Sequence, residues 1–143
     1  MGNSQSYCSK ITYEDVQHIL NNNTNFLIIS TLEENYQSCL LPNTIHINHE
    51  AKVINDLIEH DRLDTNILIY GMNCNDDKVY NQQKKLFSLG FKNVYIYLGG
   101  LFEWLCLQDI YGRDAFPTTS EELDILRYKP PSVMNKYLIT YNN

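Results

Sequence analysis

The sequence is poor in arginine and cysteine. Its 143 residues include three isolated arginines, Arg62, Arg113 and Arg127, which argues against an arginine-based phosphate site. The four cysteines, at positions 8, 39, 74 and 106, contain no C-x-x-C pair and are too widely spaced for a disulfide scaffold. We therefore expect an intracellular, cytoplasmic protein whose thiols are reduced.

Positive charge and long apolar runs are also missing. With 11 Lys+Arg against 17 Asp+Glu, the formal net charge is −6, so nothing draws the chain toward nucleic acid or anionic lipid. No apolar run approaches the length of about 18 residues that a membrane-spanning helix needs, and no secretory signal is seen. The length and the 43% of hydrophobic residues instead predict one globular domain with an ordinary core.

The first residues carry a short lipidation motif. The letters MGNSQS at positions 1–6 match M-G-x-x-x-[ST], the pattern for myristoylation of Gly2 after removal of Met1. One myristoyl chain anchors only marginally, and because no polybasic patch is nearby, Cys8 is the candidate for a second lipid. The motif predicts membrane association through lipid. The alternative is that residues 1–10 form only a flexible leader.

Short apolar runs alternate along the chain with amphipathic segments of helical period. This alternation predicts an α/β fold, with a mainly parallel central sheet and helices on both faces. The expected strands are 26–29, 44–48, 66–70 and 93–97. The expected helices are one that begins at a capping box of Thr12 and Asp15, then 50–60, 76–89 and a short one after Gly99-Gly100.

The periodic pattern fades near Asp109, and three of the four prolines follow that point. We therefore divide the chain into a leader (1–10), one α/β domain (11–108) and a C-terminal extension (109–143). The extension is interpreted as a wrapping arm with one short helix near 120–126.

Three short elements of the domain resemble those of a known family. They are LPNTI at 41–45, LGFKNV at 89–94 and GGLFEW at 99–104. Together with the order of strands and helices, they make residues 11–107 resemble the rhodanese-like domain of the rhodanese and cell-cycle phosphatase superfamily. The resemblance implies a catalytic loop between the strand at 66–70 and the helix at 76–89.

In the family that this chain resembles, the strand before that loop ends in a catalytic cysteine. Its thiolate attacks a sulfane sulfur and becomes a persulfide, which inward-pointing amides and the next helix N-terminus hold. Here Gly71 stands at the cysteine position and offers no nucleophile. The remaining loop residues are Met72, Asn73, Cys74, Asn75, Asp76 and Asp77.

The charge of this loop also departs from the family pattern. Asp76 and Asp77 fit the N-terminal positions of the following helix, where they satisfy its dipole themselves and repel thiosulfate or phosphate. The loop has no arginine, which argues against phosphatase activity. The family's D-x-R element at the end of its first strand is replaced by Ile29-Ser30-Thr31.

We therefore favour a catalytically inactive rhodanese-like domain that acts as a binding or regulatory module for an unidentified protein partner. The alternative is a sulfurtransferase that uses Cys74 as a shifted nucleophile, because Cys74 lies in the loop just before a helix N-terminus. A third hypothesis is a structural protein whose extension, 109–143, docks on a partner. No cofactor or metal site is predicted, since His46 and His49 straddle a strand end. The oligomeric state is left open.

Overall fold

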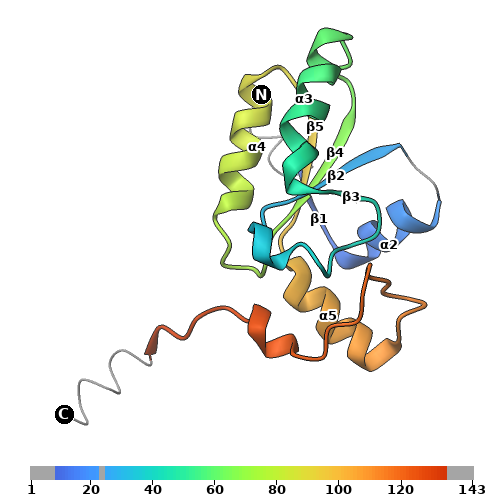
Figure 1. The fold of residues 1–143 in the computed structure, drawn as a ribbon, viewed down its shortest axis with the longest axis vertical. Coiled ribbons are helices and arrows are strands. Elements are labelled where there is room, and N and C mark those ends of the chain that lie inside the picture. Colours follow the sequence, from blue (N-terminus) through green and yellow to red (C-terminus); the bar gives the residue numbers. More distant parts are fainter. Residues whose placement is uncertain (1–8, 23–24, 135–143) are drawn as a thin grey trace.

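The described chain, residues 9–22 and 25–134 of a computed structural model, contains a five-stranded parallel sheet (Figure 1). The sheet has the strand order β1-β5-β4-β2-β3, and every neighbouring pair is parallel. The strands are β1 (Lys10–Ile11), β2 (Phe26–Ser30), β3 (Thr44–Ile45), β4 (Asn66–Tyr70) and β5 (Asn93–Tyr97).

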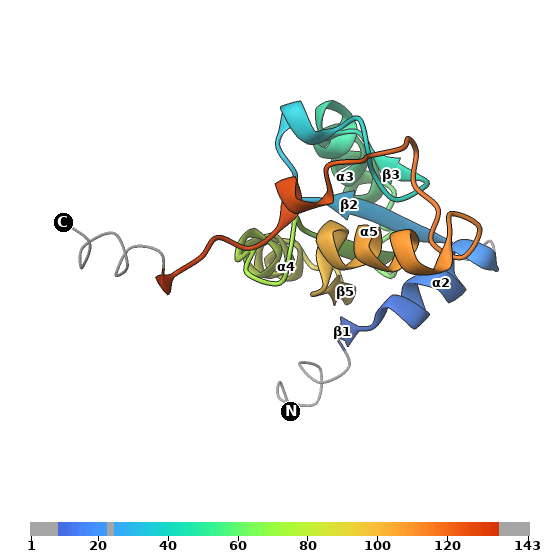
Figure 2. The same ribbon diagram turned by 90° about the horizontal axis from the view of Figure 1, so that it is seen from below.

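Helices cover both faces of this sheet, as Figure 2 shows from a second direction. Their bounds are α2 (Tyr13–Asn21), α3 (Glu50–Glu59), α4 (Lys78–Ser88) and α5 (Gly100–Tyr111). Val16 of α2 and Trp104 of α5 belong to one hydrophobic cluster, whereas Ile54 of α3 and Leu86 of α4 belong to a second. The sheet lies between these two layers.

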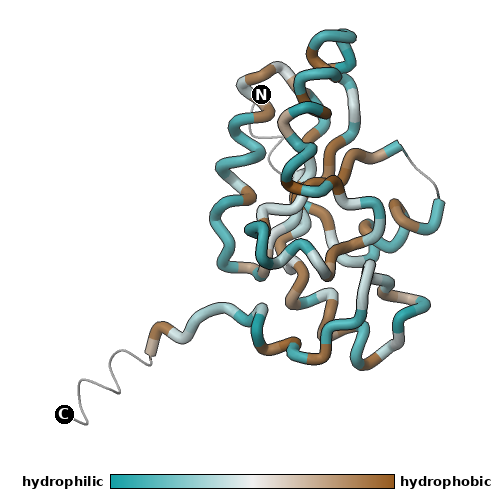
Figure 3. The backbone as a smooth tube through the Cα atoms, viewed as in Figure 1, coloured by the Kyte–Doolittle hydropathy of each residue, from teal (hydrophilic) through white to brown (hydrophobic). Residues whose placement is uncertain are grey.

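Strand β4 serves both layers. Leu68 and Tyr70 pack with α2 and α5, whereas Ile67 and Ile69 pack with α3 and α4, because successive side chains of a strand point to opposite faces. All four side chains are completely buried. Burial on both faces explains why the strand is a continuous apolar run. Helix α4, which buries one side only, is largely hydrophilic along its length (Figure 3).

The predicted fold class is confirmed, and so is the first helix start. Thr12 Oγ1 accepts a hydrogen bond from Asp15 N at 3.4 Å, and Asp15 Oδ2 accepts one from Thr12 N at 2.9 Å. These two bonds form the expected capping box, which satisfies two amide groups at the open end of α2.

Several expected boundaries were wrong. Strand β1 was not expected, and β3 stops at Ile45 because a 3₁₀ turn, η2 (Ile47–His49), follows it. Helix α5 continues to Tyr111, and its last three residues are exposed and carry no apolar period. The helix expected near 120–126 is replaced by the 3₁₀ turn η3 (Ile125–Tyr128).

Residues 112–128 of the C-terminal extension pack on the domain and run along α5 (Figure 2). Phe116 and Tyr128 are buried in the cluster that contains Trp104. Trp104 Nε1 donates a hydrogen bond to Pro117 O at 2.9 Å, and Thr119 N donates one to Leu40 O at 2.8 Å. This part of the extension is therefore packed against the domain.

Among the described helices, none has the length and apolar character needed to cross a bilayer.

Candidate functional site

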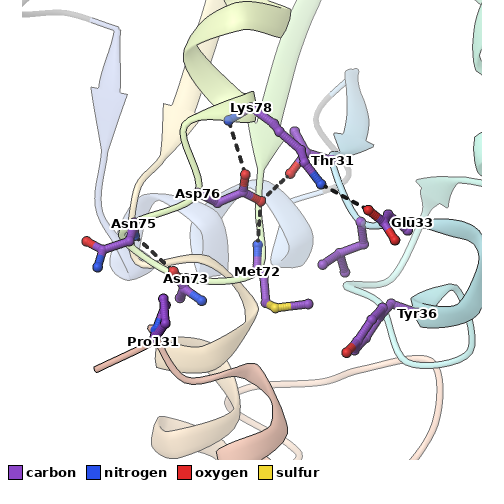
Figure 4. Close-up of a pocket in the computed structure, with 10 residues that line it drawn as sticks. Thr31, Glu33, Tyr36, Met72, Asn73, Asn75, Asp76, Lys78 and Pro131 are labelled. Atoms are coloured by element: carbon purple, nitrogen blue, oxygen red, sulfur yellow. Dashed lines mark hydrogen bonds and ion pairs between the residues drawn. The ribbon is translucent and has the colours of Figure 1, made fainter. Parts of the chain in front are cut away.

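The loop after β4 lies beside the segment that follows β2. Ser30 pairs with Tyr70 in the sheet register, and Thr31 N donates a hydrogen bond to Tyr70 O at 3.0 Å. Ligands of open parallel sheets bind at this carboxyl edge of the strands. A cavity of about 370 Å³ opens there (Figure 4). It is lined by Thr31, Leu32, Glu33, Tyr36, Met72, Asn73, Asn75, Asp76, Lys78 and Pro131.

The N-terminus of α5 holds the start of this loop. Leu101 N donates a hydrogen bond to Gly71 O at 2.9 Å, and Phe102 N donates one to Met72 O at 2.8 Å. Gly100 permits the approach, because its φ is 68° and a Cβ there would lie 2.7 Å from Gly71 O. The second glycine of the Gly-Gly motif therefore brings α5 against the loop backbone.

The carboxylate of Asp76 lies inside the loop. Its Oδ2 accepts hydrogen bonds from Thr31 Oγ1 at 2.6 Å and from Met72 N at 3.1 Å. Its Oδ1 accepts one from Lys78 N at 3.1 Å, which satisfies the open end of α4 as expected. Asp77, in contrast, is the N-cap residue of α4 and makes no side-chain capping bond.

Gly71 is buried against this carboxylate. A Cβ placed on Gly71 would lie 2.8 Å from Asp76 Cγ and 2.9 Å from Asp76 Cβ, and it would be closer still to Oδ2. Non-bonded carbon atoms normally stay about 3.5–4.0 Å apart. A side chain at position 71 therefore does not fit while Asp76 keeps its place.

Other polar groups of the loop are also paired internally. Asn75 N donates a hydrogen bond to Asn73 Oδ1 at 2.9 Å, and Asp76 N donates one to Asn73 O at 3.2 Å. The side-chain amide of Asn73 donates to Tyr128 O in the extension at 2.9 Å. The loop thus forms its own network, and the cavity beside it is the space that remains for a ligand.

Cys74 lies on the solvent side of the loop. It is exposed, and its Sγ is 3.8 Å from Asn75 Oδ1. Cys74 is not among the described residues that line the cavity, although its neighbours on both sides are. Gly2 and Cys8 lie outside the described residues, so lipidation at either position stays a prediction.

Tyr36 and the extension form the opposite wall. Tyr36 belongs to the 3₁₀ turn η1 (Glu34–Tyr36), and the guanidinium carbon of Arg127 lies 4.3 Å from its ring centroid. Arg127 Nη1 is 3.2 Å from Glu122 Oε1. Tyr128 packs edge-on against Tyr36 with ring centroids 5.6 Å apart, and burial raises the pKa of Tyr128 to about 12. Tyr36 is thus fixed by contacts with the chain's own extension.

The two histidines considered for a metal site lie away from this cavity. The ring centroids of His46 and His49 are 6.0 Å apart, and His46 Nδ1 accepts a hydrogen bond from Asn48 N at 3.2 Å. Within residues 9–22 and 25–134, no three His, Cys, Asp or Glu side chains gather as metal ligands.

Sequence reasoning missed the cavity residues that come from other segments. Glu33 and Tyr36 follow β2, and Pro131 belongs to the extension. The place of Thr31 in the site could be predicted, because Thr31 directly follows β2 and adjacent parallel strands end at the same edge of a sheet. No sequence pattern predicts that Tyr36 and Pro131 line the cavity, since only the tertiary fold brings them to the loop.

Comparison with known proteins agrees with this architecture. The model of the rhodanese-like domain family matches residues 12–106. The BH2092 protein from Bacillus halodurans has a TM-score of 0.60 at 16% identity, with 95% of this chain and 94% of that chain covered. The rhodanese-like domain of the Alr3790 protein from Anabaena sp. has a TM-score of 0.54 at 21% identity, with 87% and 86% covered.

A larger enzyme shares the fold in part. The thiosulfate sulfurtransferase from Pseudomonas aeruginosa has a TM-score of 0.52 at 17% identity, with 68% of this chain but 18% of that chain covered. No protein among those with curated functions matches the chain. At these identities the structural neighbours establish the fold alone.

Proposed function

Because the chain belongs to the rhodanese-like domain family, we propose that it is a member without sulfurtransferase activity, which serves as a binding module for a protein partner. One observation carries the proposal: the Asp76 carboxylate fills the space into which a side chain at position 71 would extend. A cysteine there would place its Cβ 2.8 Å from Asp76 Cγ and 2.9 Å from Asp76 Cβ.

The hydrogen bonds of the loop support the same proposal. An anionic persulfide needs amide donors directed at it, and here Met72 N and Lys78 N donate to the Asp76 carboxylate. A carboxylate in this position also repels an anionic sulfur donor. The cavity beside the loop is unfilled by these contacts and provides the binding surface of the proposed module.

One observation favours a second candidate, a sulfurtransferase that uses Cys74. Its thiol is exposed and belongs to the same loop. In such a reaction the thiolate would attack the outer sulfur of thiosulfate, form an S–S bond and release sulfite with the bonding electron pair. Against this candidate stands the position of Cys74, which is outside the cavity.

The test is a sulfur-transfer assay on the purified chain, with thiosulfate as donor, cyanide as acceptor and formation of thiocyanate as the measurement. Wild type is compared with Cys74→Ser, and the thiosulfate sulfurtransferase from Pseudomonas aeruginosa is the positive control. We expect no activity in either form. Activity that disappears in Cys74→Ser would establish the second candidate. Activity in both forms would mean that another thiol carries the reaction, and it would refute the proposal.

A further inference from the structure

We propose that the cavity of Figure 4 binds a cationic side chain, arginine or lysine, from a protein partner. This inference rests on the proposed function and specifies the chemistry that the binding module recognises. It follows from the charge of the cavity, its walls, its size and the way in which the chain already binds one of its own arginines.

The first argument is the carboxylate beside the cavity. Three hydrogen bonds to Asp76 satisfy its oxygens, but the donors are a hydroxyl and two backbone amides, none of which is a cation. Within residues 9–22 and 25–134, the ion pairs are Lys78 with Glu33, which also line the cavity, and Arg127 with Glu122. Asp76 therefore has no cationic partner of its own. A cation that enters the cavity would supply one.

The second argument is the nature of the walls. Leu32, Tyr36, Met72 and Pro131 line the cavity together with the polar groups. Figure 4 shows the Met72 side chain extending from the loop toward the side of the cavity on which Tyr36 lies. Such a combination suits an aliphatic stem with a charged end, because the stem packs on apolar groups while the cation reaches the carboxylate.

The third argument is an arginine site within the chain itself. The guanidinium of Arg127 lies over the Tyr36 ring and pairs with the Glu122 carboxylate. An aromatic ring and a carboxylate together favour a guanidinium through cation–π attraction and a charge-assisted hydrogen bond. Tyr36 and Asp76 both line the cavity, so a cation there would meet the carboxylate of Asp76 and the same ring that Arg127 contacts.

The size of the cavity is sufficient for one side chain. Ligand cavities commonly measure about 300–1,000 Å³, and this one, at about 370 Å³, lies near the lower limit. It therefore has room for an extended side chain. The charge also distinguishes this ligand from the anionic sulfur donors of active relatives.

The test uses the full chain with ¹³C-labelled methionine methyl groups. The sequence has three methionines, so Met72 gives one of at most three signals, and Met72→Leu assigns it. N-acetyl-arginine methylamide and N-acetyl-lysine methylamide are titrated against three comparison compounds. These are the citrulline analogue, which is isosteric with arginine but neutral, guanidinium chloride, which has no stem, and thiosulfate.

We expect both amino-acid cations to shift the Met72 signal saturably and the citrulline analogue to bind at least about tenfold more weakly. Equal binding of citrulline would overturn the inference, because charge would not matter. Equal binding of guanidinium chloride would also overturn it, because the stem would not matter. A shift with thiosulfate in place of the cations would identify an anion site instead.

Two variants and a control locate the site. Asp76→Asn removes the charge and is expected to weaken arginine binding at least about fivefold, whereas Glu59→Gln, an equal charge change on α3, leaves it unchanged. Tyr36→Leu, which removes none of the loop's hydrogen bonds, is expected to weaken it about two- to fivefold through the lost cation–π contact. Unchanged binding in Tyr36→Leu refutes the inference even if Asp76→Asn does not fold. The sulfur-transfer assay tests the proposed function separately, since absence of arginine binding leaves its result untouched.

Discussion

The contact between Gly71 and Asp76 leads to a sharp prediction about coupled stability. Gly71→Ala adds a Cβ that would lie 2.8 Å from Asp76 Cγ, well inside normal contact distance. The φ of Gly71 is not in the left-handed region, which among the described glycines holds only Gly90, Gly100 and Gly112. Backbone strain therefore contributes nothing, and the steric conflict with Asp76 decides the outcome.

The magnitude follows from that conflict. Overpacking of a buried site costs about 1–3 kcal/mol, so Gly71→Ala is expected to lower the free energy of unfolding by that amount. Asp76→Ala removes three hydrogen bonds of the carboxylate and is expected to cost about 2–4 kcal/mol alone. In the Asp76→Ala background the added methyl group no longer meets Cγ or Oδ2, although the Cβ of residue 76 still lies 2.9 Å from it. There the cost of Gly71→Ala should fall below about 1 kcal/mol, because one close contact remains and the restriction of the unfolded chain by alanine offsets part of it.

The assay is urea unfolding of the wild type, both single variants and the double variant, compared at equal m values. We expect the double variant to be more stable than the two single losses together imply, by about 1–2 kcal/mol. Asp77→Ala is the matched control, since Asp77 is the neighbouring carboxylate and makes no side-chain capping bond. It should show no coupling with Gly71→Ala. Additivity of Gly71→Ala and Asp76→Ala within about 0.5 kcal/mol would refute the placement of the carboxylate.

Three further predictions concern other parts of the molecule. Gly100→Ala should destabilise by roughly 2–5 kcal/mol, because it combines left-handed strain with a Cβ 2.7 Å from a backbone oxygen. Gly112→Ala, where φ is 100° and no atom lies within 4 Å, should be destabilised by backbone strain alone and so by less. Equal losses of unfolding free energy for the two variants in urea would contradict this explanation. Tyr128→Ala should cost about 3–5 kcal/mol, since its ring is fully buried, and a loss below 1 kcal/mol would mean that the extension is not packed as described. Burial raises the pKa of Glu50, so its contribution to stability is present below its ordinary value of 4.5 and is lost as the pH rises through the raised pKa. Glu50→Gln should therefore gain stability relative to wild type between pH 4.5 and pH 7, and a pH-independent difference in thermal unfolding would argue against this assignment.

Local signals in the sequence predicted most of the fold. The five residues of β4 are all apolar except Asn66, and the capping box at Thr12 and Asp15 depends on contacts only three residues apart. Such patterns survive in a single sequence because their energetics are local. Strand β1 has only two residues and is a strand because it pairs with β5, so no local sequence pattern predicts it.

The candidate site likewise has contacts that local sequence predicts and contacts that only the folded chain creates. The position of Asp76 at the start of α4 was predictable, because a carboxylate near a helix N-terminus is stabilised wherever the helix forms. Its second oxygen reaches Thr31, 45 residues away, and Asn73 reaches Tyr128, 55 residues away. Nothing in the neighbourhood of either residue encodes those partners, since the sheet and the extension bring them together only after folding.

A loop that folds around its own carboxylate differs in charge and in hydrogen bonding from a loop that holds an anion. In an anion-binding loop the amides remain unsatisfied until the ligand arrives, and their positive potential supplies the affinity. Here Met72 N and Lys78 N are satisfied by Asp76. The loop is therefore stable without a ligand and offers negative charge to the cavity. A cysteine introduced at position 71 alone is expected to give no sulfur transfer, because Asp76 would still occupy the adjacent space and accept from the amides that a persulfide needs. The proposed inactivity thus rests on two residues at once, and the cavity lined by Asp76 and Tyr36 is the proposed binding surface.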